Sequence, residues 1–290
     1  RKGKVPVLNI VGDHATTHVP YDAQLQSDIE TVARNVSPGF VRTSRSTGDL
    51  CRDAAEAITA ARGLPGQVAT LILPADVSWG DGALPCPPPP LPRPEAADDT
   101  TVAAVSAAVR SGGKVALLLG GRALRERSLL AAARIAAHSG VTLLAEVFPT
   151  RMERGAGLPT VERIAYLAEM AGVQLAGIEH LILVDAKAPV SFFAYPGKKS
   201  DLVPEGCTVH TLAAPTQDAA ASLEKLAAAL GATQAQPALQ AAQRPGRPRG
   251  RLTAPKVCKA VGHLLPANAI LVDEAITSGL MLSVMTAGAP

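Results

Sequence analysis

The sequence predicts a protein of the α/β class, with open parallel sheets that carry helices on both faces. Two observations support this prediction: short apolar runs of strand length recur along the chain, and capped, helix-like stretches lie between them. Most of the runs are apolar at successive positions, which is typical of parallel strands covered on both faces. The repeated strand–helix–strand order favours right-handed crossovers.

The predicted strands are apolar runs rich in Val, Ile and Leu. In chain order they are residues 5–11, 68–73, 115–119, 142–147, 180–185, 207–212 and 269–273. The predicted helices are residues 47–62, 124–138, 160–171 and 219–230. The first helix opens with hydroxyl residues and Asp49, which is a helix-start signal. Gly140 and Gly231 follow the second and fourth helices and act as stop signals.

Composition limits the functional classes. A length of 290 residues predicts about two domains, or two and a remnant. Apolar residues at 47% and charged residues at 18% indicate a large core. The net charge of +3 argues against a nucleic-acid surface, and no apolar run approaches the roughly 18 residues of a membrane span. The four cysteines show no CxxC spacing, so neither a zinc ribbon nor a disulfide scaffold is indicated, and a cytoplasmic protein is expected.

Two proline-rich segments are predicted linkers, residues 85–100 and 233–255. They divide the chain into residues 1–84, 101–232 and 256–290. The second linker holds four arginines that could form a phosphate-binding tail. Interleaved Pro and Gly, with no aromatic residue to stack on a base, favour a solvated linker instead. Because the chain begins without Met and runs directly into a strand, we expect it to be an internal piece of a longer protein.

In open α/β sheets, ligands bind beyond the carboxyl ends of the strands, so the segments after the strands are the candidate sites. Gly120 and Gly121 follow one strand and could present backbone N–H groups to an anion, or could form a tight turn without a ligand. The loop at residues 12–22 carries Asp13, His14, His18 and Asp22, which are metal-ligand types. Its Thr-Thr pair and proline favour a polar loop at a domain or subunit contact.

Two later segments are also candidates. Phe192, Phe193 and Tyr195 lie in the loop after the fifth predicted strand, where they could wall a pocket or hold the loop onto its own domain. Thr277 and Ser278 follow the last predicted strand, where hydroxyl groups suit a phosphate or diphosphate. An N-cap at either residue would explain the same sequence.

Three stretches in order carry a resemblance to a known family. The segment from VLNIVGDHATTH onward ends in Gly66-Gln67-Val68 and Pro74-Ala-Asp76, close to the pattern GPV-x-L-x-x-P-x-D. The other two are SGGKVALLLGGRALRERSLLAAARIAAHSG and PANAILVDEAITSG. Together they resemble thiamine-diphosphate-dependent enzymes of the acetolactate synthase large-subunit group. The resemblance implies a complete central Rossmann-like domain flanked by two partial domains, the second half of a pyrimidine-binding domain and the start of a diphosphate-binding domain.

The resemblance also implies a function. It points to a carboligase or decarboxylase that acts on 2-keto acids, uses thiamine diphosphate and Mg²⁺, and assembles as a homodimer or homotetramer. By position, Glu274, Thr277 and Ser278 match the segment that helps to hold the diphosphate. The loop from Phe192 to Tyr195 matches a segment that borders the substrate in some related decarboxylases.

Two departures from the family pattern limit this expectation. The activating glutamate and the GDG…N motif are expected outside these residues, so no catalytic residue is assigned and the 290 residues alone are expected to be inactive. The stretch LLAEVFPTRMERGAGLP departs from the flavin-binding pattern of true acetolactate synthases, which leaves FAD open. The alternatives are a non-catalytic nucleotide-binding or assembly module built on the Gly120–Gly121 turn, and a structural paralogue without the cofactor.

Overall fold

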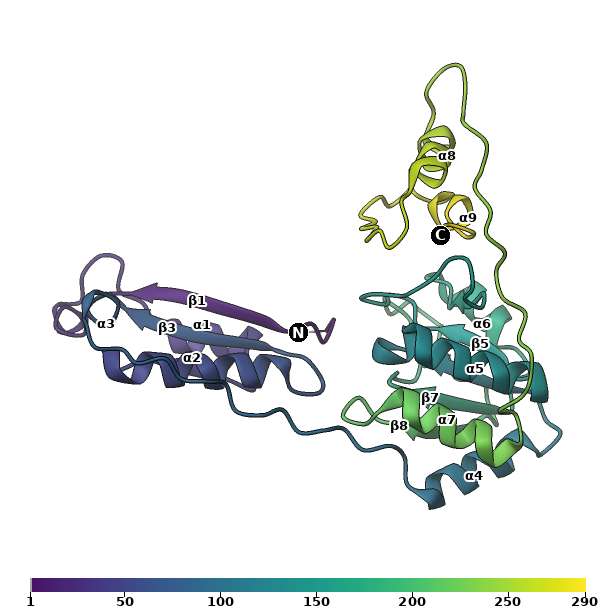
Figure 1. Ribbon diagram of the computed structural model, residues 1–290, viewed down its shortest axis with the longest axis horizontal. Coiled ribbons are helices and arrows are strands. Elements are labelled where there is room, and N and C mark those ends of the chain that lie inside the picture. Colours follow the sequence, from purple (N-terminus) through teal and green to yellow (C-terminus); the bar gives the residue numbers. More distant parts are fainter. Residues whose placement is uncertain (1) are drawn as a thin grey trace. The chain divides into compact units, whose positions relative to one another are not determined.

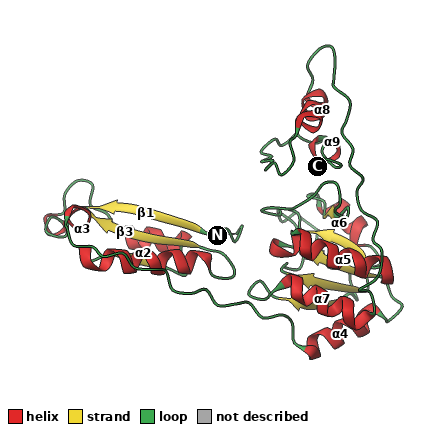
Figure 2. Cartoon of the chain, viewed as in Figure 1, coloured by secondary structure: helices red, strands yellow, loops and turns green. Residues whose placement is uncertain are grey.

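A computed structural model describes residues 2–290 and divides into two compact units (Figures 1 and 2). Among the described residues, the first unit comprises residues 2–95 and 215–217, and the second comprises residues 96–214 and 218–290. Over the described residues, every helix is too short or too polar to cross a membrane.

The first unit is built on a three-stranded parallel sheet with the strand order β1-β3-β2. Its strands are β1 (Val7–Asp13), β2 (Val41–Thr43) and β3 (Val68–Pro74). Its helical segments are η1 (Val19–Tyr21), α1 (Ile29–Val36), α2 (Thr47–Arg62) and α3 (Ala75–Trp79). The helix predicted at residues 47–62 is confirmed at both ends. Ser46 caps its start, because the Ser46 hydroxyl accepts a hydrogen bond from the Asp49 amide.

Helices cover both faces of this sheet. Ala57 and Ala61 of α2 pack against Ala69 of β3, where small side chains allow close approach. On the other face, the Ser37 hydroxyl at the end of α1 lies 2.6 Å from the Thr70 hydroxyl, and both residues are buried. Since Ala69 and Thr70 are neighbours on one strand, they point to opposite faces.

The second unit contains a five-stranded parallel sheet with the order β6-β5-β4-β7-β8. Its strands are β4 (Val115–Leu119), β5 (Thr142–Ala145), β6 (Glu162–Arg163), β7 (His180–Val184) and β8 (Thr208–Ala213). The chain starts at the centre, runs to one edge and returns to build the other edge. The order therefore reverses between β4 and β7, the place where doubly wound sheets open a ligand crevice.

Helices again lie on both faces, as the sequence predicted. The helical segments of this sheet are α4 (Asp99–Val109), η2 (Gly121–Leu124), α5 (Glu126–Ser139), α6 (Ala168–Leu175) and α7 (Ala219–Leu230). Leu117 and Ile182 are fully buried in the core that includes α4, α5 and α7. Leu118 and Leu181 are buried in the core that includes α6. This alternation explains why the strands read as continuous apolar runs.

Two predicted elements are wrong. Residues 269–273 form no strand, and Ile270 and Val272 are 75% and 73% exposed. A strand needs a neighbour for its backbone hydrogen bonds, and none of the described strands lies beside this segment. Residues 160–171 are not one helix: Glu162 and Arg163 pair with β5, and helix α6 begins only at Ala168. The buried Val161 and Ile164, which flank these two residues, hold this short strand against the core.

The remaining helices, α8 (Ala254–Leu264) and α9 (Leu282–Met285), follow the second predicted linker. The end of the chain contacts the loop after β5 within the second unit. The Ala156 amide donates to the Ala289 carbonyl at 2.8 Å, and Arg154 donates to the Ser283 carbonyl. Burial, and then the charge of Arg163, lower the pKa of Arg154.

Candidate functional site

The turn after β4 lies at the point where the strand order reverses. Gly121 has a φ of +43°, in the left-handed region that favours glycine. The Gly120 amide donates to the Val184 carbonyl at 3.0 Å, so the β4–β7 pairing continues to the very end of the strands. The turn therefore has the strand-to-helix geometry that the sequence predicted.

The N–H groups of that turn donate hydrogen bonds to carboxylates of this chain. The Gly121 amide donates to Glu146 Oε1 at 3.2 Å, and the Arg122 amide donates to Asp185 Oδ2 at 2.8 Å. Glu146 follows β5 and Asp185 follows β7, so the two acceptors come from strands on either side of β4. The geometry supports the tight turn without a ligand rather than the anion site.

The start of α5 is capped in the same way. Its first amide, that of Glu126, donates to Glu153 Oε2 at 2.6 Å. Glu153 also pairs with Arg125 at 3.6 Å and with Arg151 at 3.7 Å. This carboxylate is therefore fixed from three directions.

Four aromatic side chains gather on the loops that follow β5, β6 and β7. The Phe192 ring lies 5.6 Å from the Phe148 ring and 5.2 Å from the Tyr166 ring, while Phe193 lies 4.6 Å from Phe192. All four rings are at least 45% exposed. Phe192 therefore holds three loops together, as the staple interpretation expects, and the ring cluster stays open to solvent.

The segment with Glu274, Thr277 and Ser278 lies in an exposed turn before α9. None of the three residues follows a strand, because residues 269–273 are not extended into a sheet. The N-cap interpretation is also wrong, since α9 begins at Leu282 and its N-cap position is Met281. The Ser278 carbonyl accepts a hydrogen bond from the thiol of the buried Cys258 at 3.4 Å, which ties this turn to α8.

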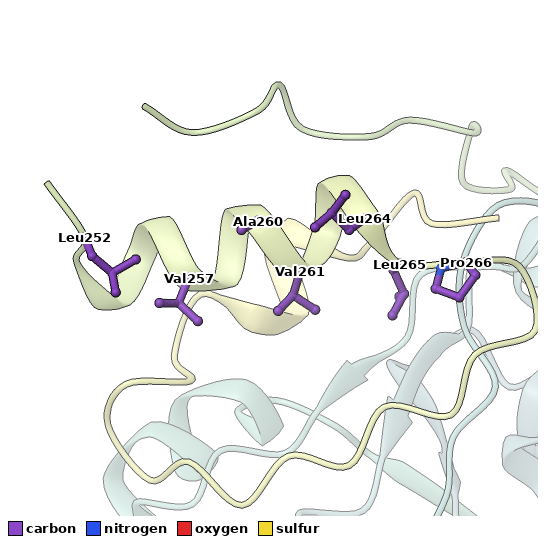
Figure 3. A pocket seen from close by; sticks show the side chains of 7 residues that line it. All are labelled: Leu252, Val257, Ala260, Val261, Leu264, Leu265 and Pro266. Atoms are coloured by element: carbon purple, nitrogen blue, oxygen red, sulfur yellow. The ribbon is translucent and has the colours of Figure 1, made fainter. Parts of the chain in front are cut away.

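An apolar groove of about 490 Å³ runs along α8 (Figure 3). Its lining contains no polar side chain: Leu252, Val257, Ala260, Val261, Leu264, Leu265 and Pro266. Without a donor, acceptor or titratable group, this groove carries no chemistry by itself.

The loop after β1 is held by the helix that follows the neighbouring strand β3. Asp76, in the first turn of α3 just after β3, accepts hydrogen bonds from the Thr16 amide at 2.9 Å and from its hydroxyl at 2.5 Å. The His14 and His18 rings lie 5.3 Å apart, beside Tyr21. Over residues 2–290, no three His, Cys, Asp or Glu side chains gather in a way that could hold a metal ion. The loop is therefore polar and held by Asp76, while its location at a domain or subunit contact stays a prediction.

Sequence reasoning missed Glu146, Glu153 and Asp185. These three carboxylates accept hydrogen bonds from the turn after β4 and from the start of α5. A signal for two of them was present, since Glu146 and Asp185 fall at the ends of predicted strands 142–147 and 180–185. A carboxylate that ends a buried apolar run is unusual enough to mark a contact with backbone donors. Which donors they reach follows only from the strand order.

Comparisons with known proteins show what this chain is similar to. No family model matches the chain. The chain is 49% identical over all 290 residues to the "Putative acetolactate synthase large subunit IlvX" of Mycobacterium tuberculosis, covering 55% of that protein. The resemblance that the sequence motifs predicted is thus confirmed: the chain is similar in sequence to a protein named as an acetolactate synthase large subunit. It spans just over half the length of the relatives that it matches.

Solved structures show the same fold. A "putative thiamin diphosphate-dependent enzyme" from Mycobacterium smegmatis matches 98% of this chain, at a TM-score of 0.74 and 18% identity. This chain covers 58% of that structure. The thiamine diphosphate-dependent 4-hydroxybenzoylformate decarboxylase of Rhodococcus jostii matches 99% of this chain, also at a TM-score of 0.74, with 15% identity and 57% of its own length covered.

Proposed function

We propose that this chain is part of a thiamine-diphosphate-dependent carboligase or decarboxylase that acts on 2-keto acids. The observation that carries the proposal is the match over all 290 residues, at 49% identity, to a relative named as an acetolactate synthase large subunit. In this proposal, residues 101–232 form the complete central Rossmann-like domain, and residues 1–84 and 256–290 belong to the pyrimidine- and diphosphate-binding domains. Active molecules are homodimers or homotetramers, working in the cytoplasm.

The residues proposed for the cofactor fit its chemistry in part. The hydroxyl groups of Thr277 and Ser278 are exposed, and hydroxyls donate to phosphate oxygens. The Glu274 carboxylate would repel a diphosphate, so it fits the predicted role less well than the two hydroxyl groups do. The cofactor, when bound, supplies the carbanion chemistry that adds to a keto-acid carbonyl and releases carbon dioxide. In this proposal, the role of this chain is to hold the diphosphate end of the cofactor and to exclude water from it.

The test is a calorimetric titration with thiamine diphosphate in the presence of Mg²⁺, on the protein together with any flanking sequence that its source encodes. We expect saturable binding that weakens about tenfold when Thr277 and Ser278 are both replaced by Ala. The matched control is Thr253→Ala, because Thr253 is an exposed hydroxyl residue that makes no side-chain cap at the start of α8. An unchanged affinity in the double variant removes the two residues from the site. Absence of binding by the wild-type protein contradicts the proposal.

A further inference from the structure

A dinucleotide bound to the central domain would need the turn at the switch point of the sheet. In doubly wound folds, the diphosphate sits against the first turn and the start of the following helix, where free N–H groups point at it. In this chain those groups belong to Gly121, Arg122 and Glu126. Their availability decides whether FAD, which true acetolactate synthases hold on this domain, fits here.

All three N–H groups already have acceptors. They donate to Glu146, Asp185 and Glu153 at 3.2, 2.8 and 2.6 Å. Each acceptor is a carboxylate, and charged acceptors make stronger hydrogen bonds than neutral ones. A diphosphate would have to displace these bonds and lie beside the displaced negative charges.

The space at the turn is also filled. A Cβ atom at Gly120 would lie 2.6 Å from the Asp185 carbonyl oxygen, and one at Gly121 would lie 2.3 Å from Asp185 Oδ2. Neither glycine can therefore carry a side chain unless Asp185 moves. The ends of β4 and β7 are therefore closed against each other.

The backbone of Asp185 is held in an unfavourable conformation. Asp185 has a φ of +48°, which non-glycine residues seldom adopt, and the residue is only 4% exposed. Such backbone strain persists where the surroundings enforce it. In this conformation the Asp185 carboxylate accepts the hydrogen bond from the Arg122 amide.

We infer that the central domain is closed to dinucleotides by its own carboxylates, and that the protein works without FAD. The three carboxylates of Glu146, Glu153 and Asp185 take the place that the diphosphate of a flavin or nucleotide would occupy. The same geometry removes the basis for a nucleotide-binding module on the Gly120–Gly121 turn.

The first experiment follows amide hydrogen exchange at residues 118–128 of the purified protein, with and without FAD or ADP. ADP carries the diphosphate without the flavin ring, so the two ligands separate the contributions. We expect no change in exchange with either ligand at concentrations up to about 1 mM. Protection of this segment by either ligand would overturn the inference. This outcome is independent of the proposed thiamine chemistry, because neither ligand reports on Thr277 or Ser278.

The second experiment tests the carboxylate itself. Asp185→Gly removes the acceptor at a backbone angle that glycine adopts freely, whereas Asp185→Asn keeps an acceptor oxygen. We expect exchange at the Arg122 amide, relative to that at Leu118, to be at least about tenfold faster in Asp185→Gly and close to wild type in Asp185→Asn. Equal relative exchange in wild type and Asp185→Gly would show that the carboxylate does not close the turn.

Discussion

The Asp76 carboxylate accepts both the amide and the hydroxyl of Thr16, across 60 positions of sequence. These two bonds join the segments that follow the neighbouring strands β1 and β3. Asp76 is also the last residue of the motif that ends in Pro74-Ala-Asp76. The motif thus has a structural role here, which is to hold the loop that follows β1.

This contact gives a pH-dependent prediction. The Thr16 hydroxyl, and then its amide, lower the pKa of Asp76 below the ordinary 3.8. A lowered pKa means that the stabilisation is present above the ordinary value and is lost as the pH falls through the lowered one. We expect Thr16→Val to raise the pKa of Asp76 toward 3.8 in an NMR titration of its carboxyl carbon. Thr17→Val is the matched control, and an unchanged pKa in Thr16→Val would contradict the assignment.

The buried carboxylate of Asp53 gives a stability prediction. Asp53 is 2% exposed and accepts from Arg42 Nη1 at 2.8 Å and from the Ser44 hydroxyl at 2.7 Å. We expect Asp53→Ala to lower the free energy of unfolding by about 3 kcal/mol, because the buried Ser44 hydroxyl and the partly exposed Arg42 guanidinium lose their acceptor. Glu56 pairs with the same arginine at 2.7 Å but is more exposed, so Glu56→Ala should cost less than about 1 kcal/mol. Urea denaturation of both variants measures the difference, and equal losses would refute it.

Two glycines with positive φ should differ in their tolerance of a side chain. Gly140 ends α5 at a φ of +71° with open space around it, so Gly140→Ala should cost only about 1–2 kcal/mol for its conformation. Gly121 has a similar conformation, but an added Cβ would overlap the Asp185 carboxylate. We expect Gly121→Ala to cost at least about 3 kcal/mol in the same assay. A Gly121→Ala variant as stable as Gly140→Ala would show that the turn has room.

A histidine pair gives a second pH prediction. His180 Nδ1 lies 3.1 Å from His210 Nε2, and burial, followed by the charge of His180, lowers the pKa of His210 below 6.5. The pair therefore stabilises the fold above that value, and the contribution is lost as the pH falls through the lowered pKa. We expect the free energy of unfolding to fall less between about pH 7 and pH 5 in His210→Gln than in wild type. His138→Gln, on an exposed turn of α5, should behave as wild type. A His210→Gln variant with the wild-type pH dependence would argue against the pair.

The sequence predicts those helices and strands whose formation depends on residues close by in the chain. The strand at residues 115–119 and the helix at residues 47–62 are found at their predicted positions, because a buried apolar run and a Ser46 cap are both visible in the sequence. The segment 269–273 reads equally well as a strand, yet its formation depends on a neighbouring strand. Glu162 and Arg163 look helical and become extended because β5 lies beside them.

The candidate site was predictable only in part. The sequence predicts the Gly120–Gly121 turn. Its location at the point where the strand order reverses is typical of the α/β class. Whether its donors are free depends on Glu146, Glu153 and Asp185, which come from two other loops. Sequence spacing does not reveal contacts of this kind, so the choice between an anion site and a closed turn needed the structure.

The most direct test of the account is the release of carbon dioxide from a 2-keto acid by the purified protein, with whatever sequence naturally flanks these residues. Pyruvate and benzoylformate are the two substrates to compare. The account predicts release that requires added thiamine diphosphate and Mg²⁺ and is unchanged by added FAD. Release that proceeds equally well after complete removal of thiamine diphosphate, or no release from any 2-keto acid with both cofactors bound, would contradict it.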